Sequence, residues 1–255
     1  FRTLAWLYML SNVKKLFYCV LKMINLAEAR LPGSRELAQS IDGFAGICMA
    51  IPFFKAALKY NQRALKLRKK IGDEWGEAQS LQFLGFNYAW QGNFEKAIDL
   101  FNQARERFEK IGDLWEIGMI AEGLGYCYRS LGQCKKSMEI YRKYLDLCYK
   151  TNNTYGIFSA YIELAFNQIR IGDYDHAFYL LDKVLNTPGI SDSKFNHCYA
   201  LTMLGLVETE KGNYRKAVKF LRAAEKLDRE NNFVKNYTSI IYPYFADACI
   251  KQAQH

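Results

Sequence analysis

The residues that most often carry out chemistry in proteins are few and scattered in this sequence. Its three histidines are His176, His197 and His255, and none stands at a metal-ligand spacing from a cysteine or a carboxylate. His197 directly precedes Cys198, but adjacent residues of a helix point in different directions and do not form a nucleophile–base pair. No phosphate-binding motif of the form G-x-x-x-x-G-K-[ST] or G-x-G-x-x-G occurs. We therefore predict no catalytic residue, no metal site and no cofactor, and we expect a protein that is not an enzyme.

The cysteines have the pattern of reduced thiols. They number seven, an odd count, and none belongs to a C-x-x-C pair. Their positions are Cys19, Cys48, Cys127, Cys134, Cys148, Cys198 and Cys249. Those from 127 to 198 fall within apolar helical patterns, where a thiol packs as a small hydrophobic side chain. Because persistent disulfides belong to oxidising compartments, we expect a cytoplasmic protein.

The elements that hold these residues repeat at a constant interval along the chain. The most regular columns are Gly92, Gly132, Gly172 and Gly212, and then Leu84, Leu124, Leu164 and Leu204. A small residue follows each of these leucines, at Gly85, Gly125, Ala165 and Gly205. Further columns hold Ala97, Ser137, Ala177 and Ala217, and then Phe101, Tyr141, Leu181 and Leu221. A register kept over this many columns, with a period of about 40 residues, indicates an array of structural repeats.

Each repeat has the pattern of two helices joined by a tight turn. Gly72 suits the left-handed residue that ends one helix, and Asp73 suits the N-cap of the next. Gly92 then ends the first helix of the unit. Apolar residues recur at spacings of three and four on both helices, at Ala78, Leu81, Leu84 and Tyr88 and at Ala97, Leu100, Phe101 and Ala104. Small side chains at Gly85 and Ala97 let the two helices approach closely, so the pattern predicts a helix hairpin.

The register extends to both ends of the chain and predicts one solenoid over residues 1–255. Its units are a partial repeat at 1–30, repeats at 31–70, 71–110, 111–150, 151–190 and 191–230, and a capping helix at 231–255. We expect eleven to twelve helices, with an altered turn at Pro52 and a last helix that Pro243 bends or delays. The chain opens on Phe1 within a first helix, which predicts a fragment of a longer protein. Lys14, Lys15 and Lys22 interrupt the apolar N-terminal stretch too closely for a membrane span.

Leu84, Gly85, Tyr88, Ala97, Phe101 and Ala104 match the consensus of the tetratricopeptide repeat (TPR) family. The match extends over nearly the whole chain, although the period is longer than the family's usual one of about 34 residues. In this respect the chain resembles the long-helix variants of bacterial signalling ATPases and regulators and of polarity scaffolds. The resemblance implies an all-α, right-handed α-solenoid whose first helices line a concave groove, and it implies binding without naming a partner.

The resemblance also assigns candidate groove residues on the first helices. These are Trp6, Phe83, Phe86, Trp90, Tyr126, Arg129, Phe166, Arg170, Tyr199 and Leu206. An accessible apolar stripe is typical of a binding site, but aromatic stripes at helical spacing are also typical of a packed core. Gln82, Phe86 and Tyr126 stand where a carboxylate clamp or an asparagine ladder would need Lys or Asn. We therefore expect an apolar helix or peptide in the groove.

The positive charge of the chain lies at its N-terminal end. Residues 1–70 hold 13 Lys and Arg and 3 acidic residues, whereas residues 71–255 hold 22 and 23. A basic patch follows one face of the helix predicted at 54–70 and consists of Lys55, Lys59, Arg63, Lys66 and Lys70. Such a patch suits an acidic partner, nucleic acid or a membrane surface, but most basic runs are solvated faces. No nucleic-acid motif accompanies it, so we expect neither nucleic acid nor a membrane as partner.

Three functions remain open from the sequence. The first is a protein-interaction scaffold within a larger signalling protein, and the second is a ligand-sensing regulatory domain of a signal-transducing ATPase or transcription regulator. The third is a self-assembly module that forms a homodimer through an uncapped end, since repeat arrays need polar caps for solubility. The first is the leading hypothesis, with a protein or peptide as the partner.

Overall fold

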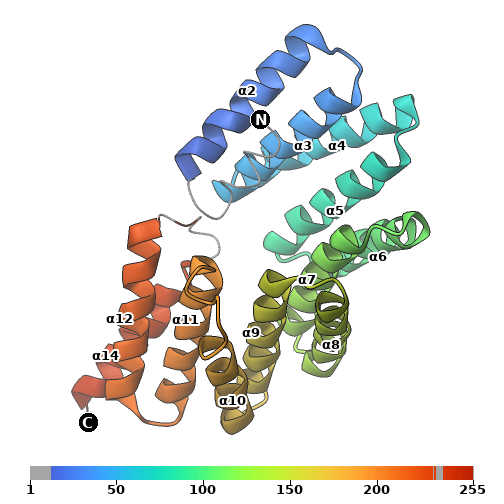
Figure 1. The fold of residues 1–255 in the computed structure, drawn as a ribbon. Coiled ribbons are helices and arrows are strands. Elements are labelled where there is room, and N and C mark those ends of the chain that lie inside the picture. The colour runs from blue at the N-terminus through green and yellow to red at the C-terminus, as the bar shows by residue number, and fades with distance from the viewer. Residues whose placement is uncertain (1–12, 232, 234–237, 255) are drawn as a thin grey trace. The chain divides into compact units, whose positions relative to one another are not determined.

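The computed structural model describes residues 13–231, 233 and 238–254, and within these ranges it contains twelve helices and no strand. The first six are α2 (Val13–Arg30), α3 (Arg35–Ala50), α4 (Phe54–Ile71), α5 (Glu74–Trp90), α6 (Phe94–Ile111) and α7 (Leu114–Ser130) (Figure 1). The others are α8 (Cys134–Lys150), α9 (Thr154–Arg170), α10 (Tyr174–Leu185), α11 (Lys194–Glu210), α12 (Tyr214–Asn231) and α14 (Ile241–Gln254). The all-α helical-repeat fold predicted from the sequence period is confirmed.

Glycines with positive φ form the turns inside the hairpins. Gly92, Gly132, Gly172 and Gly212 have φ angles of 81°, 74°, 85° and 78°, a left-handed conformation that costs other residues more than glycine. Between repeats, Gly72 ends α4 with φ 67°, and the Asp73 carboxylate then accepts the backbone N–H of Gly76 to cap α5. Gly72 therefore ends one helix and Asp73 caps the next, as their residue types predict.

The two helices of a hairpin meet where a glycine faces a large side chain. A Cβ at Gly85 on α5 would lie 2.8 Å from the ring of Phe101 on α6, closer than carbon atoms pack. Gly205 on α11 faces Leu221 on α12 in the same manner, and a Cβ there would overlap the leucine. The small-residue column in the sequence therefore marks the points of closest approach.

The chain divides into two compact units, residues 1–133 and 134–255. The boundary falls between α7 and α8, within the repeat expected at 111–150. One continuous solenoid over the whole chain therefore stays a prediction, and each unit is described by itself below.

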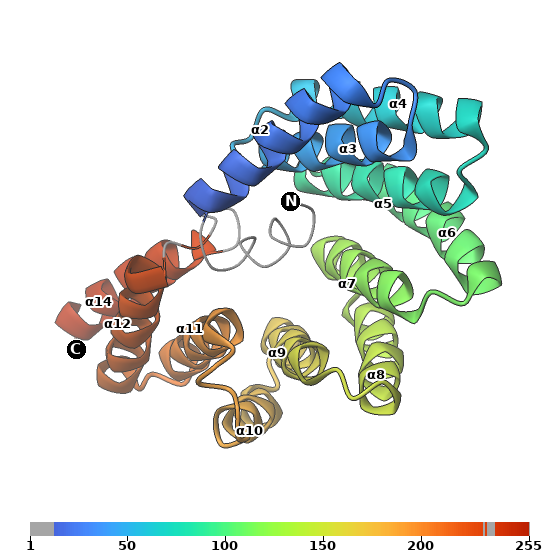
Figure 2. The same cartoon turned by 45° about the horizontal axis from the view of Figure 1, so that its top comes forward.

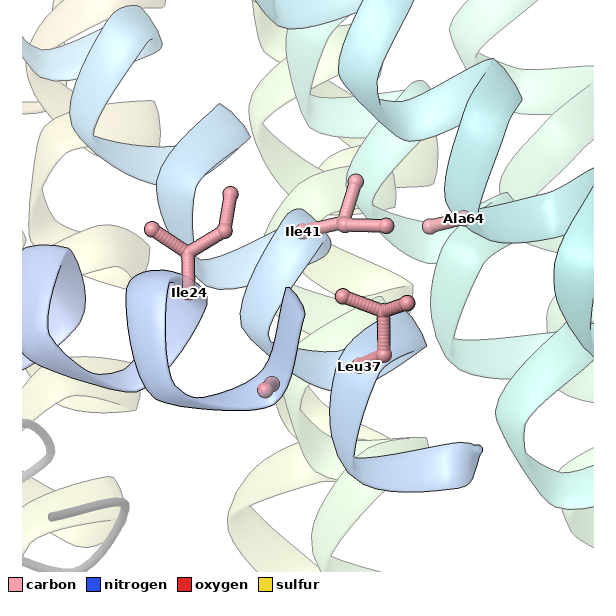
Figure 3. Packing of buried hydrophobic residues seen from close by; sticks show 5 residues of the cluster. Ile24, Leu37, Ile41 and Ala64 are labelled. Carbon is pink, nitrogen blue, oxygen red and sulfur yellow. The ribbon is translucent and has the colours of Figure 1, made fainter. Parts of the chain in front are cut away.

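In the first unit, consecutive helices pack in order from α2 to α7, and the first helix α5 also contacts the first helices α3 and α7 (Figure 2). The apolar cluster between α2, α3 and α4 shows how the pairs are held. Ile24, Leu37, Ile41 and Ala64 point toward one another from these three helices (Figure 3). All four are buried, so removal of their apolar surface from water stabilises the packing.

In the second unit, α8 packs on α9, α9 on α10, and α11 on α12, while α14 packs on both α11 and α12. Helix α10 stops at Leu185 after 12 residues, whereas α8 and α12 have 17 and 18. Pro188 stands where α10 would continue, and residues before a proline avoid the helical conformation. Pro243 lies in the first turn of α14, where its missing N–H removes no hydrogen bond within the helix.

The four cysteines expected within apolar helical patterns are buried. Six are buried and Cys249 is exposed, and all seven are free thiols. No helix in the described ranges is long and apolar enough to cross a membrane. The partial first helix predicted around residues 4–12, with Trp6, lies outside the described residues.

Candidate functional site

The predicted groove residues of α5 are partly covered by the preceding hairpin. Phe83, Phe86 and Trp90 are half-buried and pack against a cluster of Ala45, Cys48, Met49 and Ala57 on α3 and α4. The ring of Phe86 also lies 4.9 Å from that of Phe101 in an edge-to-face arrangement. These aromatics therefore serve the core on one side and keep a partly exposed surface on the other.

On α7, the predicted residues form a stacked pair. Tyr126 is half-buried, with its ring 6.0 Å from that of Phe94. The guanidinium of Arg129 lies 5.8 Å above the Tyr126 ring, a cation–π contact, and the Arg129 residue is only 6% exposed. Arg129 therefore positions the tyrosine more than it offers a charge to solvent.

The second unit holds the remaining groove candidates. Phe166 and Tyr199 are half-buried, and the Tyr199 hydroxyl donates to Oε1 of Glu163 at 3.3 Å. Arg170 is exposed at the end of α9, whereas Leu206 on α11 is 8% exposed and belongs to the core. Of the aromatic column at 86, 126, 166 and 206, the first three positions keep partly exposed rings and the last does not.

The basic patch on α4 faces solvent along its whole length. Lys55, Lys59, Arg63, Lys66 and Lys70 are all exposed. Arg63 forms an ion pair with Glu28 of α2 at 3.0 Å. An ion pair between exposed groups contributes little to stability, so the patch remains a charged surface with one of its five cations paired.

A buried polar network between α3, α4, α5 and α7 was not predicted. Asp42 and Arg68 are each 1% exposed, and their side chains form an ion pair of 3.2 Å. The Asp42 carboxylate also accepts from Asn61 at 3.0 Å and from the Ser80 hydroxyl at 2.7 Å. Arg68 donates to the backbone oxygen of Gly76 and, at 3.0 Å, to Gln79 Oε1. The carboxylate and the guanidinium thereby gain partners in place of water.

Burial sets the protonation chemistry of this network. Desolvation raises the pKa of Asp42 to about 6, against the opposing pull of the Arg68 charge and of the hydrogen bonds from Ser80 and Asn61. The same cause raises the pKa of Glu116 on α7, to which Gln79 donates at 3.4 Å. The signal was present in the sequence, because Asn61 and Arg68 stand one repeat before Phe101 and Phe108, at positions where the next repeat has large apolar rings.

A second unpredicted cluster joins α8, α9 and α10 at the surface. Lys183 Nζ donates to the Tyr161 hydroxyl at 2.7 Å, and the hydroxyls of Tyr161 and Tyr149 are 2.9 Å apart. Burial opposes ionisation of Tyr161, but its hydrogen bonds with Lys183 and Tyr149 and the charge of Lys183 outweigh burial and lower its pKa. No group of three or more His, Cys, Asp or Glu able to hold a metal ion occurs in the described ranges.

The helices and their half-exposed aromatics define an all-α repeat protein built from helix hairpins. Two models described as tetratricopeptide repeat match the sequence, one over residues 37–110 and 76–150 and the other over 199–231. Together they match more than half of the chain, which belongs to the tetratricopeptide repeat family. No curated protein matches the chain.

Solved structures with similar folds share little sequence with this chain. A Rap protein complexed with competence and sporulation factor has a TM-score of 0.76 at 15% identity, over 97% of this chain and 72% of its own. NprR in complex with its cognate peptide NprX has a TM-score of 0.66 at 14% identity, over 95% and 70%. A signal transduction ATPase from Pyrococcus horikoshii with a tetratricopeptide repeat sensor has a TM-score of 0.69 at 16% identity, over 94% and 39%. At these identities the likeness concerns the fold.

Proposed function

We propose that the chain is a protein-interaction module that binds a peptide or helix on the apolar faces of its first helices. The observation that carries the proposal is the column of Phe86, Tyr126 and Phe166, whose rings are only half-buried. A merely solvated surface would have polar residues at such positions, and aromatic side chains are enriched where partners bind most strongly.

Each unit carries its own set of first-helix aromatics. In the first unit, Phe83, Phe86 and Trp90 rest on the cluster of α3 and α4, and Tyr126 is held between Phe94 and Arg129. In the second unit, hydrogen bonding to Glu163 fixes the Tyr199 hydroxyl. Rings that are already fixed lose little conformational entropy on binding, which favours affinity.

The comparisons support a peptide as the kind of partner. The Rap protein and NprR were both solved as complexes, with competence and sporulation factor and with the peptide NprX. Both share the fold of this chain over nearly its whole length. We therefore carry over the class of partner and no partner sequence.

A library of random peptides displayed against the immobilised chain tests the proposal. We expect it to enrich peptides with apolar anchors at helical spacing, because such anchors fill apolar faces of helices. The affinity of a selected peptide is then compared between the wild type and the variant Tyr126→Ala with Phe166→Ala. A loss of about tenfold or more is expected if each ring is an anchor.

Tyr179→Ala is the matched control, because Tyr179 is 61% exposed and lies on the second helix α10. It should bind the selected peptides like the wild type. Circular dichroism and the melting temperature of each variant show whether it remains folded. Undiminished binding by a folded Tyr126→Ala, Phe166→Ala variant would contradict the assignment.

A ligand-sensing regulatory domain is the second candidate function. It is favoured by the likeness to the ATPase from Pyrococcus horikoshii, whose tetratricopeptide repeats are described as a sensor. A metabolite library screened by thermal shift tests it, because a ligand that binds the folded state raises the melting temperature as occupancy increases. A specific metabolite that stabilises the chain while no peptide binds would favour the sensor.

A self-assembly module is the third candidate. The homodimer through an uncapped end concerns residues around 1–12, which lie outside the described residues. Light scattering over a range of concentrations tests it, and a constant monomer mass would dispose of it.

A further inference from the structure

An open hollow lies on the second unit along α12, beside the end of α14. Its volume is about 590 Å³, and it is lined by Arg215, Val218, Lys219, Arg222, Ala223, Lys226 and Gln252. All of these except Gln252 belong to α12, which packs on α14 (Figure 2). Four of the seven lining residues are cations and none is acidic.

The acidic side chains near this hollow already have partners. Glu225 pairs with Arg229 at 2.7 Å, and Asp247 of α14 pairs with Lys251 at 2.9 Å. Asp228 is buried, and its carboxylate accepts from the Tyr242 hydroxyl at 3.0 Å. Among the four cations of the hollow, Lys226 has an ion pair, with Glu230 at 3.8 Å. The row of positive charge is therefore mostly uncompensated within the described residues.

The same repeat positions are also mostly basic on α4, as Lys55, Lys59 and Lys66, but they are not uniformly basic on the other second helices. The positions of Arg215, Lys219, Arg222 and Lys226 correspond on α6 to Glu95, Asp99, Asn102 and Glu106. In the next hairpin but one they correspond to Asp175, Tyr179 and Asp182 on α10 and to its C-cap Asn186. On α8 they alternate in sign, as Lys135, Glu139, Arg142 and Asp146. The repeat architecture thus tolerates either charge at these positions. A uniformly basic row also carries a cost, because like charges one helical turn apart repel each other.

We propose that this hollow docks an acidic amphipathic helix of a protein partner. The four cations span about 16 Å along α12 at helical spacing, which suits carboxylates placed every one to two turns on a second helix. Val218 is buried between them and packs on α14, while Ala223 is exposed, so the floor can receive one apolar side chain. Charge complementarity of this kind steers association and fixes register.

The apolar floor of the hollow, formed by Val218 and Ala223, favours an acidic helix over other negatively charged partners. A phosphate backbone or an anionic membrane would gain from the four cations but would leave the apolar floor of Val218 and Ala223 unused. A helix that presents carboxylates beside one apolar residue uses both. The site is on the second helix α12, whereas the proposed peptide site is on the first helices, so the two proposals rest on different residues.

A labelled synthetic helix with glutamate at every third or fourth position, and alanine and leucine elsewhere, is the probe. Its affinity for the full chain is measured by fluorescence anisotropy. The variant Arg215→Glu with Arg222→Glu should weaken binding by about tenfold or more, since it places repulsive charge opposite the carboxylates. Both arginines are exposed, so the melting temperature of this variant should stay near that of the wild type.

The control is Lys135→Glu with Arg142→Glu, which changes the same two repeat positions on α8 and alters the net charge equally. We expect its affinity to stay within about twofold of the wild type, because binding at a specific site depends on local charge more than on net charge. Peptides selected on the first-helix face should bind the Arg215→Glu, Arg222→Glu variant as they bind the wild type. Each proposal can therefore fail without affecting the test of the other.

Three outcomes would overturn the proposal. They are no binding of the glutamate helix to the wild type, an equal loss in the α8 control, and tighter binding of duplex DNA or phosphatidylserine vesicles than of the helix. The last result would assign the hollow to phosphate groups instead of to a protein helix.

Discussion

The hairpin of α3 and α4 and the hairpin of α5 and α6 place different chemistry at the same repeat positions. Asn61 and Arg68 of α4 correspond to Phe101 and Phe108 of α6. The first pair belongs to the hydrogen-bonded network around Asp42, whereas the rings of the second pair are fully buried. The backbone architecture is nevertheless shared, because both hairpins use the same turn positions and helix lengths of 16 to 18 residues.

The difference teaches that the repeat specifies close packing and not apolarity at each position. A buried polar group is tolerated where neighbouring helices supply partners for it, as they do around Asp42. A buried ion pair is weak support for stability, yet losing one partner is costly because the other charge is left in a dry interior. Substitutions in the polar core should therefore destabilise the protein by breaking charge pairs. Substitutions in the apolar core should do so by creating clashes or cavities.

The largest effect should come from Arg68→Ala. This variant leaves Asp42 buried without its cation, and we expect a loss of about 3–5 kcal/mol in the free energy of unfolding, measured by urea denaturation. Adding Asp42→Asn should recover part of the loss, since the uncompensated carboxylate is then absent. An Arg68→Ala variant as stable as the wild type would show that the network does not hold α3, α4 and α5 together.

A smaller effect is expected from Gly85→Ala in the apolar core. The added Cβ meets the Phe101 ring, and overpacking of this kind costs about 1–3 kcal/mol. One repeat earlier, the position of Gly85 is held by Ala45 and that of Phe101 by the smaller Asn61, so the need for glycine depends on the large side chain that faces it. Adding Phe101→Leu to the Gly85→Ala variant should recover part of the lost stability, because the smaller side chain leaves room for the Cβ.

Gly46→Ala is the control for this prediction. A Cβ at Gly46 would lie 3.8 Å from the Phe83 ring, an ordinary contact. Because alanine favours a helix over glycine by about 1 kcal/mol, this variant should be as stable as the wild type or more stable. Equal destabilisation by Gly85→Ala and Gly46→Ala would contradict the claim that only Gly85 is required for close packing.

A dependence of stability on pH should come from Asp42 in the polar core and not from the rings of the apolar core. The pKa of Asp42 is raised to about 6 in the folded protein, so the folded state binds its proton more tightly than the unfolded chain does. The contribution of this group to stability is therefore full below its ordinary pKa and is lost as pH rises through about 6.

The difference in unfolding free energy between the wild type and Asp42→Asn measures this contribution. The wild type should lose stability relative to Asp42→Asn as pH rises from about 4 to about 7, since only the wild type carries the titrating carboxyl. Phe101→Leu serves as the comparison in the apolar core, and its difference from the wild type should be constant over that range. A flat Asp42→Asn difference would contradict the assignment.

The sequence predicts the repeat architecture well because the signals are local. Gly92, Gly132, Gly172 and Gly212 mark turns through a backbone conformation, and Gly85 marks a close approach through the absence of a side chain. The site was less predictable because it depends on neighbouring helices. The repeat period places Leu206 in the same column as Phe166, yet the packing of α11 buries Leu206. Similarly, the pairing of Asp42 with Arg68 joins residues on two different helices, which no single-helix pattern reveals.

The most direct test of the proposed function is to map where a bound peptide lies. A library-selected peptide that carries a photoreactive group is cross-linked to the full chain, and the attachment sites are identified by mass spectrometry. We predict cross-links on the first helices α5, α7, α9 and α11, next to Phe86, Tyr126, Phe166 or Tyr199. Cross-links confined to the second helices α6, α8, α10 and α12 would contradict the proposal.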